Sequence, residues 1–234
     1  MDASTHWFRV ALALSLGPAI SNGFARFCYA LVLPSMQASL NWSYTEAGAL
    51  HGANALGYLL GAVSAPAFMR RFGAKRVFRD TIFVTTASLL VMALASRYDV
   101  FLALRFVGGV SSALTFIAGG VLAATLTDDP RRSSAALAIY FSGIGFAMFL
   151  SGLVLPAFFA IAGDGAWAFA WLGLGLAALV AAFTAAWGAS KVAPNAGSAV
   201  GARAAVPWRR LVPIVLCYFS FGLGHVGYMT FIVA

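Results

Sequence analysis

The sequence has few charged residues for its length. Only 9% of its 234 residues are Asp, Glu, Lys or Arg, and 62% are hydrophobic. Soluble domains carry about 25% charged residues, so a water-exposed shell cannot be built from this composition. At roughly 20 apolar residues per helical crossing of a bilayer, the chain is long enough for several crossings with short connections. The composition therefore predicts an integral membrane protein.

Cysteine is almost absent, and sequence motifs of soluble enzymes are missing. The two cysteines, Cys28 and Cys217, lie far apart within apolar segments, and no CxxC or mixed Cys/His spacing occurs. This pattern excludes a disulfide framework and predicts no metal site. The sequence also contains no GxxxxGK[ST] phosphate loop, no GxSxG and no HExxH. We therefore expect no cofactor, no catalytic residues and no nucleotide-driven step.

The basic residues follow the membrane topology. The formal net charge is +8, but nearly all Lys and Arg lie at the ends of apolar runs, which does not form a nucleic-acid-binding face. They gather in alternate connections, near residues 70–79, 131–132 and 191–210, whereas the other connections hold only Arg97 beside Asp99. By the positive-inside rule, the N-terminus and the basic connections are predicted to be cytoplasmic, in a multi-pass inner-membrane protein.

Seven apolar runs divide the chain. They cover residues 8–36, 45–68, 77–96, 101–126, 134–162, 166–189 and 211–234. Backbone groups in lipid must pair within their own segment, and the alternation typical of barrel strands is absent, so each run is expected to be a helix. The fold class is therefore predicted as an all-α membrane protein.

The connection over residues 190–208 is rich in Ala, Gly and Ser and contains two prolines, a composition typical of a linker. We expect a six-helix unit over residues 1–189, a cytoplasmic linker over 190–208 and a seventh transmembrane helix over 209–234. Because the last run stops at the chain end with no polar flank, we also expect a truncated chain.

The first apolar run contains an arginine in its middle third. Asn22, Arg26 and Tyr29 are spaced i, i+4 and i+7, so they share one face of an α-helix. A cation at such a depth costs at least about 2.5 kcal/mol on insertion scales, and this face is expected to point into the bundle or into a water-filled cavity. Arg26 is interpreted as an anion-binding or gating residue. The alternatives are a structural pair with a carboxylate or carbonyl, and snorkelling to the outer surface.

The second run repeats the pattern with His51, Asn54 and Tyr58, and Glu46 lies one turn earlier. A histidine changes charge near neutral pH, which makes His51 and Glu46 candidates for proton coupling. The alternative for Glu46 is a capping box with Ser43, which has the required spacing. The alternative for His51 is a hydrogen bond to a neighbour. The substrate-cavity candidates of both runs are Asn22, Arg26, Tyr29, His51, Asn54 and Tyr58.

Two further residues are candidates for proton or substrate chemistry. Arg105 in the fourth run shares a stripe with Gly109 and Ser112, whose small side chains leave room for its guanidinium to reach another helix or water. His225 in the seventh run is flanked by glycines. Abundant glycines elsewhere in the runs are expected to let helix backbones approach closely.

Two short motifs resemble the major facilitator superfamily. Residues 71–76 look like that family's cytoplasmic motif between helices two and three, where a turn glycine with basic residues helps to gate the inner side. The usual acid of the motif is Arg70 in this chain, and Asp80 is the candidate to replace it. The gate residues implied by the resemblance are Arg71, Gly73, Lys75, Arg76 and Asp80.

The second motif, residues 105–109, looks like the Arg-x-x-x-Gly motif of the family's fourth helix, which is linked to proton coupling. By this resemblance, Arg105 is a coupling residue. Glu46 and His225, which are candidates because of their residue type and position, complete the set of proton-coupling candidates. Residues 23–34, 43–48, 54–61 and 227–231 resemble the YbfB/YjiJ-type branch of bacterial facilitators.

The resemblance implies a fold of twelve helices in two halves, each a 3+3 repeat, which rock about a site between them. The chain corresponds to the N-terminal half plus the start of helix seven. The resemblance also implies a proton-coupled secondary transporter of a small organic solute in a bacterial inner membrane. The expected partners of the protein are the bilayer, the solute, protons and a missing C-terminal half or partner half. The alternatives are a non-transporting scaffold or half-transporter subunit and, more distantly, an intramembrane enzyme.

Overall fold

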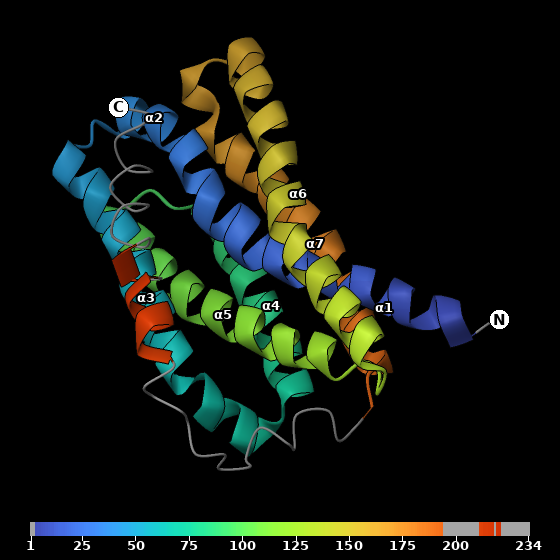
Figure 1. Cartoon of the computed structure of the whole chain (residues 1–234). Coiled ribbons are helices and arrows are strands. Elements are labelled where there is room, and N and C mark those ends of the chain that lie inside the picture. The colour runs from blue at the N-terminus through green and yellow to red at the C-terminus, as the bar shows by residue number, and fades with distance from the viewer. Residues whose placement is uncertain (1–2, 194–210, 218, 221–234) are drawn as a thin grey trace.

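The computed structural model describes residues 3–193, 211–217 and 219–220, and this part of the chain contains helices and no strand (Figure 1). The elements in chain order are α1 (Ala3–Pro18), η1 (Ala19–Phe27), α2 (Cys28–Leu40), α3 (Tyr44–Phe72), α4 (Ala74–Met92), α5 (Tyr98–Ala124), α6 (Pro130–Ala162), η2 (Asp164–Ala166) and α7 (Trp167–Lys191). The prediction of an all-α protein is confirmed for these residues. His225 and most of the predicted linker lie outside the described residues.

The first apolar run forms one continuous helical path with a π-helical middle. The nine residues of η1 join α1 to α2 without a break. Pro18 stands directly before η1, and a proline ring is incompatible with regular helical hydrogen bonding one turn back. π-Helical turns are rare and occur often at functional sites. The candidates Asn22 and Arg26 both lie in this segment.

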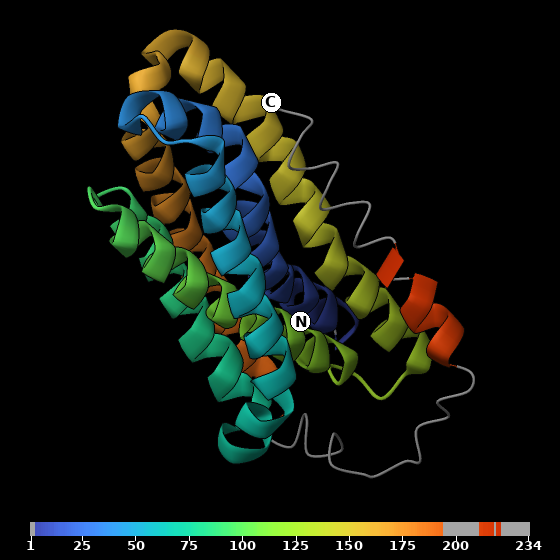
Figure 2. The same cartoon turned by 90° about the vertical axis from the view of Figure 1, so that its left-hand side faces the viewer.

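The long helices lie side by side around the first one. Helix α3 packs on α5, α4 packs on both α5 and α7, and α1 packs on α6 and α7. Seen from the side, α1 lies between α6 on one flank and the pair α3 and α5 on the other (Figure 2). Its apolar side chains Val10 and Leu14 are fully buried. The first helical path is therefore the centre of the described arrangement.

Glycines allow α3 and α5 to meet backbone to backbone. A Cβ atom added at Gly57 or Gly109 would collide with a main-chain carbonyl oxygen of the facing helix, and one at Gly61 would lie 2.5 Å from the carbonyl oxygen of Val110. The predicted role of glycine in helix packing is confirmed here. Gly48 and Gly52, also in α3, have no neighbouring atom within 4 Å of that position, so they do not contribute to this interface.

Local chain signals fix the ends of α3. The Ser43 hydroxyl accepts a hydrogen bond from the Glu46 backbone N–H (3.2 Å), and the Glu46 carboxylate accepts one from the Ser43 N–H (2.8 Å), which completes a capping box. At the other end Gly73 adopts φ +78°, a conformation that glycine reaches without strain. It makes the tight turn into α4.

By length and composition, three of the described helices are suited to crossing a membrane: α5, α6 and α7. The first helical path is not among these three, because η1 divides it into two shorter α-helices, α1 with 16 residues and α2 with 13. Both views place the α3–α4 turn, the α5–α6 connection and the end of α7 at one end of the molecule (Figures 1 and 2). These are the basic connections, so the charge asymmetry of the sequence is an asymmetry between two ends.

Candidate functional site

The centre of the candidate site is Arg105, a residue of α5 that is only 2% exposed. An unpaired charge buried to this degree is strongly unfavourable unless its donors are satisfied. The Arg105 Nη1 donates a hydrogen bond to the backbone carbonyl of Ala25 in η1 (2.7 Å), and its Nε donates a long one to the carbonyl of Leu50 in α3 (3.4 Å). The guanidinium thus ties three elements together.

One donor atom of Arg105 is left over. Its Nη2 is fully buried and has no hydrogen-bond partner among the described residues. Buried polar atoms are paired in the great majority of cases, so an orphan is a point that needs an explanation. The guanidinium lies over the ring of Tyr29, with its Cζ 4.2 Å from the ring centroid, which is a cation–π distance.

Tyr29 joins the arginine to the histidine. This tyrosine is 1% exposed, and its hydroxyl donates to the carbonyl of Ala47 in α3 (3.0 Å). The His51 ring is stacked against Tyr29, with centroids 6.3 Å apart and an interplanar angle of 23°. The positive charges of both Arg26 and Arg105 act on His51. Two arginines and one histidine therefore share a single region of the helix bundle.

Arg26 is partly exposed and has a different environment. Its guanidinium Cζ lies 4.9 Å from the ring centroid of Tyr58 in α3 and 6.0 Å from that of Phe27. Asn22 is buried; its amide donates to Ser21 Oγ (3.3 Å), and it neighbours the Tyr58 hydroxyl. In the described residues the Arg26 side chain is held by rings and has no ion-pair partner.

Asn54 has a structural contact in this region. Its amide Nδ2 donates to the backbone carbonyl of Arg105 (3.0 Å), and the asparagine is 3% exposed. The bond links α3 to α5 one helical turn before Gly109, whose backbone closely approaches the carbonyl of Asn54. Asn54 thereby fixes the register in which Arg105 is presented. The structure brings together the six predicted cavity residues and Arg105 around η1, α2, α3 and α5.

Glu46 lies at the start of α3 in the capping box with Ser43. Its backbone carbonyl, not its carboxylate, accepts a hydrogen bond from Tyr98 (2.9 Å). No group of three His, Cys, Asp or Glu side chains within the described part of the chain is placed to hold a metal ion.

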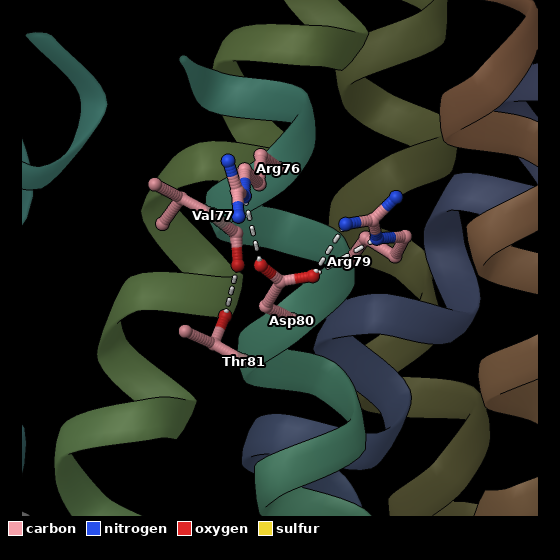
Figure 3. A network of polar contacts seen from close by, with 5 residues as sticks. All are labelled: Arg76, Val77, Arg79, Asp80 and Thr81. Carbon is pink, nitrogen blue, oxygen red and sulfur yellow. Dashed lines mark hydrogen bonds and ion pairs between the residues drawn. The ribbon is translucent and has the colours of Figure 1, made fainter. Parts of the chain in front are cut away.

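The predicted gate residues lie at the basic end of the molecule. Asp80 in α4 pairs with Arg79 (2.8 Å) and, one turn back, with Arg76 (3.5 Å), as Figure 3 shows. All three side chains are exposed, and Arg71 lies over the ring of Phe72 (5.5 Å). Exposed pairs of this kind contribute little to stability. The network is separate from the buried arginine cluster.

Hydroxyl side chains form hydrogen bonds between α4 and α5, an interaction that was not predicted from the sequence. Thr81 and Thr115 share a hydrogen bond (2.8 Å), and Thr85 donates to Ser111 (2.8 Å). Small hydroxyl residues are common where membrane helices pack closely, which was the available indication. Ser112 on α5 is the second buried polar residue with an unpartnered side-chain atom among the described residues.

Comparison with known proteins agrees with this architecture. The solved structure of the MFS (major facilitator superfamily) proton:xylose symporter XylE bound to 6-bromo-6-deoxy-D-glucose matches with a TM-score of 0.67 and 18% sequence identity. The match covers 79% of this chain and 45% of that one, so the chain spans less than half the length of that protein. No curated protein matches the chain. Residues 19–234 match the family described as uncharacterised MFS-type transporter YbfB. The chain belongs to this family of multi-pass membrane transporters.

Proposed function

We propose that the protein is a secondary transporter that moves a small organic solute across a bacterial inner membrane by alternating access, driven by the proton gradient. The observation that carries this proposal is the cluster of Arg26, Arg105 and His51, whose cationic members have no ion-pair partner among the described residues. Ionisable groups within a membrane fold are costly and mark ion and substrate pathways. Family and fold indicate a transporter rather than an enzyme.

The described helices are assigned to an N-terminal half of six membrane-crossing segments arranged as a 3+3 repeat. In such carriers the substrate site lies near the midplane between two halves. The cluster would then form one wall of the cavity, and the opposite wall would come from a C-terminal half or a partner half. The 45% coverage of the symporter chain supports this division.

The basic end is assigned to the cytoplasm, together with the N-terminus. Arg70 and Arg71 close α3, Arg131 and Arg132 begin α6, and Lys191 ends α7. By the positive-inside rule, connections rich in Lys and Arg stay on the cytoplasmic side of the membrane. The exposed network of Arg76, Arg79 and Asp80 would then belong to the inner gate.

His51 is assigned to the proton step. Among the described residues of the cluster, it is the residue type whose ordinary pKa lies nearest to neutral, whereas free arginine stays protonated and free tyrosine stays neutral there. Arg105 would also help to position His51, since it contacts the Tyr29 ring on which His51 is stacked.

The test uses the full-length protein in proteoliposomes that enclose a pH-sensitive dye. A panel of small acids, sugars and amines is added outside, and solute-dependent proton entry is recorded with and without an uncoupler. We expect one class of solute to acidify the lumen, and radiolabelled solute to accumulate only while the proton gradient is maintained. His51→Asn should abolish accumulation while facilitated exchange of solute persists. Solute accumulation that ignores the uncoupler would remove proton coupling from the proposal.

A further inference from the structure

In the described part of the chain, the charged side chains of the candidate site are all cationic. The ion pairs of the described residues are Arg76–Asp80, Arg79–Asp80, Arg97–Asp99 and Arg132–Asp129, and all lie at helix ends or connections. Neither Arg26 nor Arg105 takes part in one. Within the described part of the chain, therefore, no carboxylate balances the two buried or half-buried cations.

The two arginines are close to one another. The Nη1 of Arg105 is bonded to the carbonyl of Ala25, the residue that directly precedes Arg26. The charge of Arg26 in turn acts on Arg105. Like charges in a medium of low polarity repel strongly, and rings and carbonyls offset this only in part. A bound negative group would stabilise both cations at once.

Each arginine also has bonding capacity that the chain does not use. Arg105 keeps one fully buried nitrogen, Nη2, without a partner, and the partly exposed Arg26 guanidinium is held by the faces of Tyr58 and Phe27. Contacts to ring faces leave the five N–H groups of an arginine available in the plane of the guanidinium. A planar carboxylate or a tetrahedral phosphonate accepts such donors in pairs.

The surroundings of the donors are aromatic. Tyr29, His51 and Tyr58 contribute their rings, and Asn22 contributes an amide beside Tyr58. Ligand sites of this kind, with mostly apolar walls and a few convergent polar groups, take small molecules with an apolar body.

We propose that the substrate is an organic anion whose acidic group binds between Arg26 and the free Nη2 of Arg105 and whose body packs on these rings. The inference rests on the proposed transport function and adds the class of substrate to it. Arg26 is partly exposed, so the anion would contact it first. Arg105 is buried and forms the inner end of the site.

The test measures binding to the purified full-length protein in detergent, at constant chloride concentration, by thermal shift and tryptophan fluorescence. The probes are benzoate, phenylphosphonate and benzamide, which share a ring and differ in the head group, together with the aliphatic pair lactate and lactamide. We expect at least one anion to bind more tightly than its neutral amide by about tenfold or more, as expected for hydrogen bonds to charged groups. Which head group binds better distinguishes carboxylates from phosphonates.

Variants assign the binding to the site. Arg26→Gln should remove the preference for the anion, Arg26→Lys should retain part of it, and Arg97→Gln, at an exposed arginine outside the cluster, should leave it unchanged. If every anion binds no better than its amide, or if Arg26→Gln binds anions as wild type does, the inference is wrong. Proton-driven transport of a neutral solute would overturn this inference and leave the proposed transport function intact.

Discussion

Arg105 is fixed by contacts that depend on the shape of a guanidinium. Two of its nitrogens donate to the carbonyls of Ala25 and Leu50 on different elements, while its Cζ lies over the Tyr29 ring. A lysine has one nitrogen and no plane, so it cannot serve both carbonyls and the ring together. Arg105→Lys should lower the free energy of unfolding by about 1–3 kcal/mol, the cost of a buried acceptor left unpaired. The measurement is the thermal midpoint in detergent.

The matched control is Arg97→Lys, because Arg97 is exposed and pairs with Asp99 at a helix end. Exposed substitutions of this kind stay within about 0.5 kcal/mol. If the Arg105→Lys protein is as stable as the Arg97→Lys control, the hydrogen bonds from Arg105 to η1 and α3 do not stabilise the fold, and the prediction is wrong.

The residues of the cluster could be predicted from the sequence, but their partners could not. Arg26 and Arg105 stand out because each is a cation inside an apolar run. The carbonyls of Ala25 and Leu50 carry no sequence pattern, since every residue has one. The α-helical spacing predicts a common face for Asn22, Arg26 and Tyr29. The π-helical turn alters that geometry, so that Arg26 lies over Tyr58 while Tyr29 lies under Arg105.

Among the helices, the pair α3 and α5 depends on the absence of side chains at its crossing. A Cβ at Gly109 would collide with the carbonyl of Asn54, a backbone atom that cannot rotate away. Gly109→Ala should therefore destabilise the protein by about 1–3 kcal/mol, as overpacking does, and should loosen the site by moving Asn54 away from Arg105. Thermal unfolding measures the first effect and the binding assay measures the second.

Gly52→Ala is the control for this substitution, because Gly52 lies on α3 with open space where a Cβ would be. Its helix propensity improves by up to about 1 kcal/mol, so stability should stay the same or rise. Equal destabilisation by both changes would show that the close approach at Gly109 has no special weight.

The start of α3 offers a second test at the level of elements. The Ser43 hydroxyl pairs with the Glu46 N–H and the Glu46 carboxylate pairs with the Ser43 N–H. Ser43→Ala should cost about 1 kcal/mol of stability, and Ser43→Asp should retain most of it because aspartate also caps helices. Thermal unfolding of the two variants checks this.

The capping box was visible in the sequence because it is a local pattern, whereas the α3–α5 crossing depends on contacts distant in the chain. If Glu46 instead carries protons, Ser43→Ala should change coupling more than stability.

At the scale of the whole molecule, the two ends differ in charge. One end holds the start of α6 and the α3–α4 turn, where arginines outnumber carboxylates, and the other holds the α4–α5 connection (Figures 1 and 2). At that second end, hydrogen bonds from Arg97 hold the pKa of Asp99 below its usual range. Asp99 therefore stays ionised at neutral pH, and the pair carries no net charge. The apolar runs and the placement of the charges between them could be read directly from the sequence, because both patterns are local in the chain.

This asymmetry predicts which end faces the cytoplasm, and single cysteines can test it. In a Cys217→Ser background, where the remaining Cys28 is fully buried, Ser96→Cys marks the α4–α5 connection and Asp128→Cys marks the α5–α6 connection. A maleimide that cannot cross membranes should label Ser96→Cys in intact spheroplasts and should label Asp128→Cys only after the membrane is permeabilised. The positive-inside rule requires this direction, because the basic connections are the ones that resist translocation. The opposite labelling would invert the topology and place the Arg76, Arg79 and Asp80 network outside, where it could not act as an inner gate.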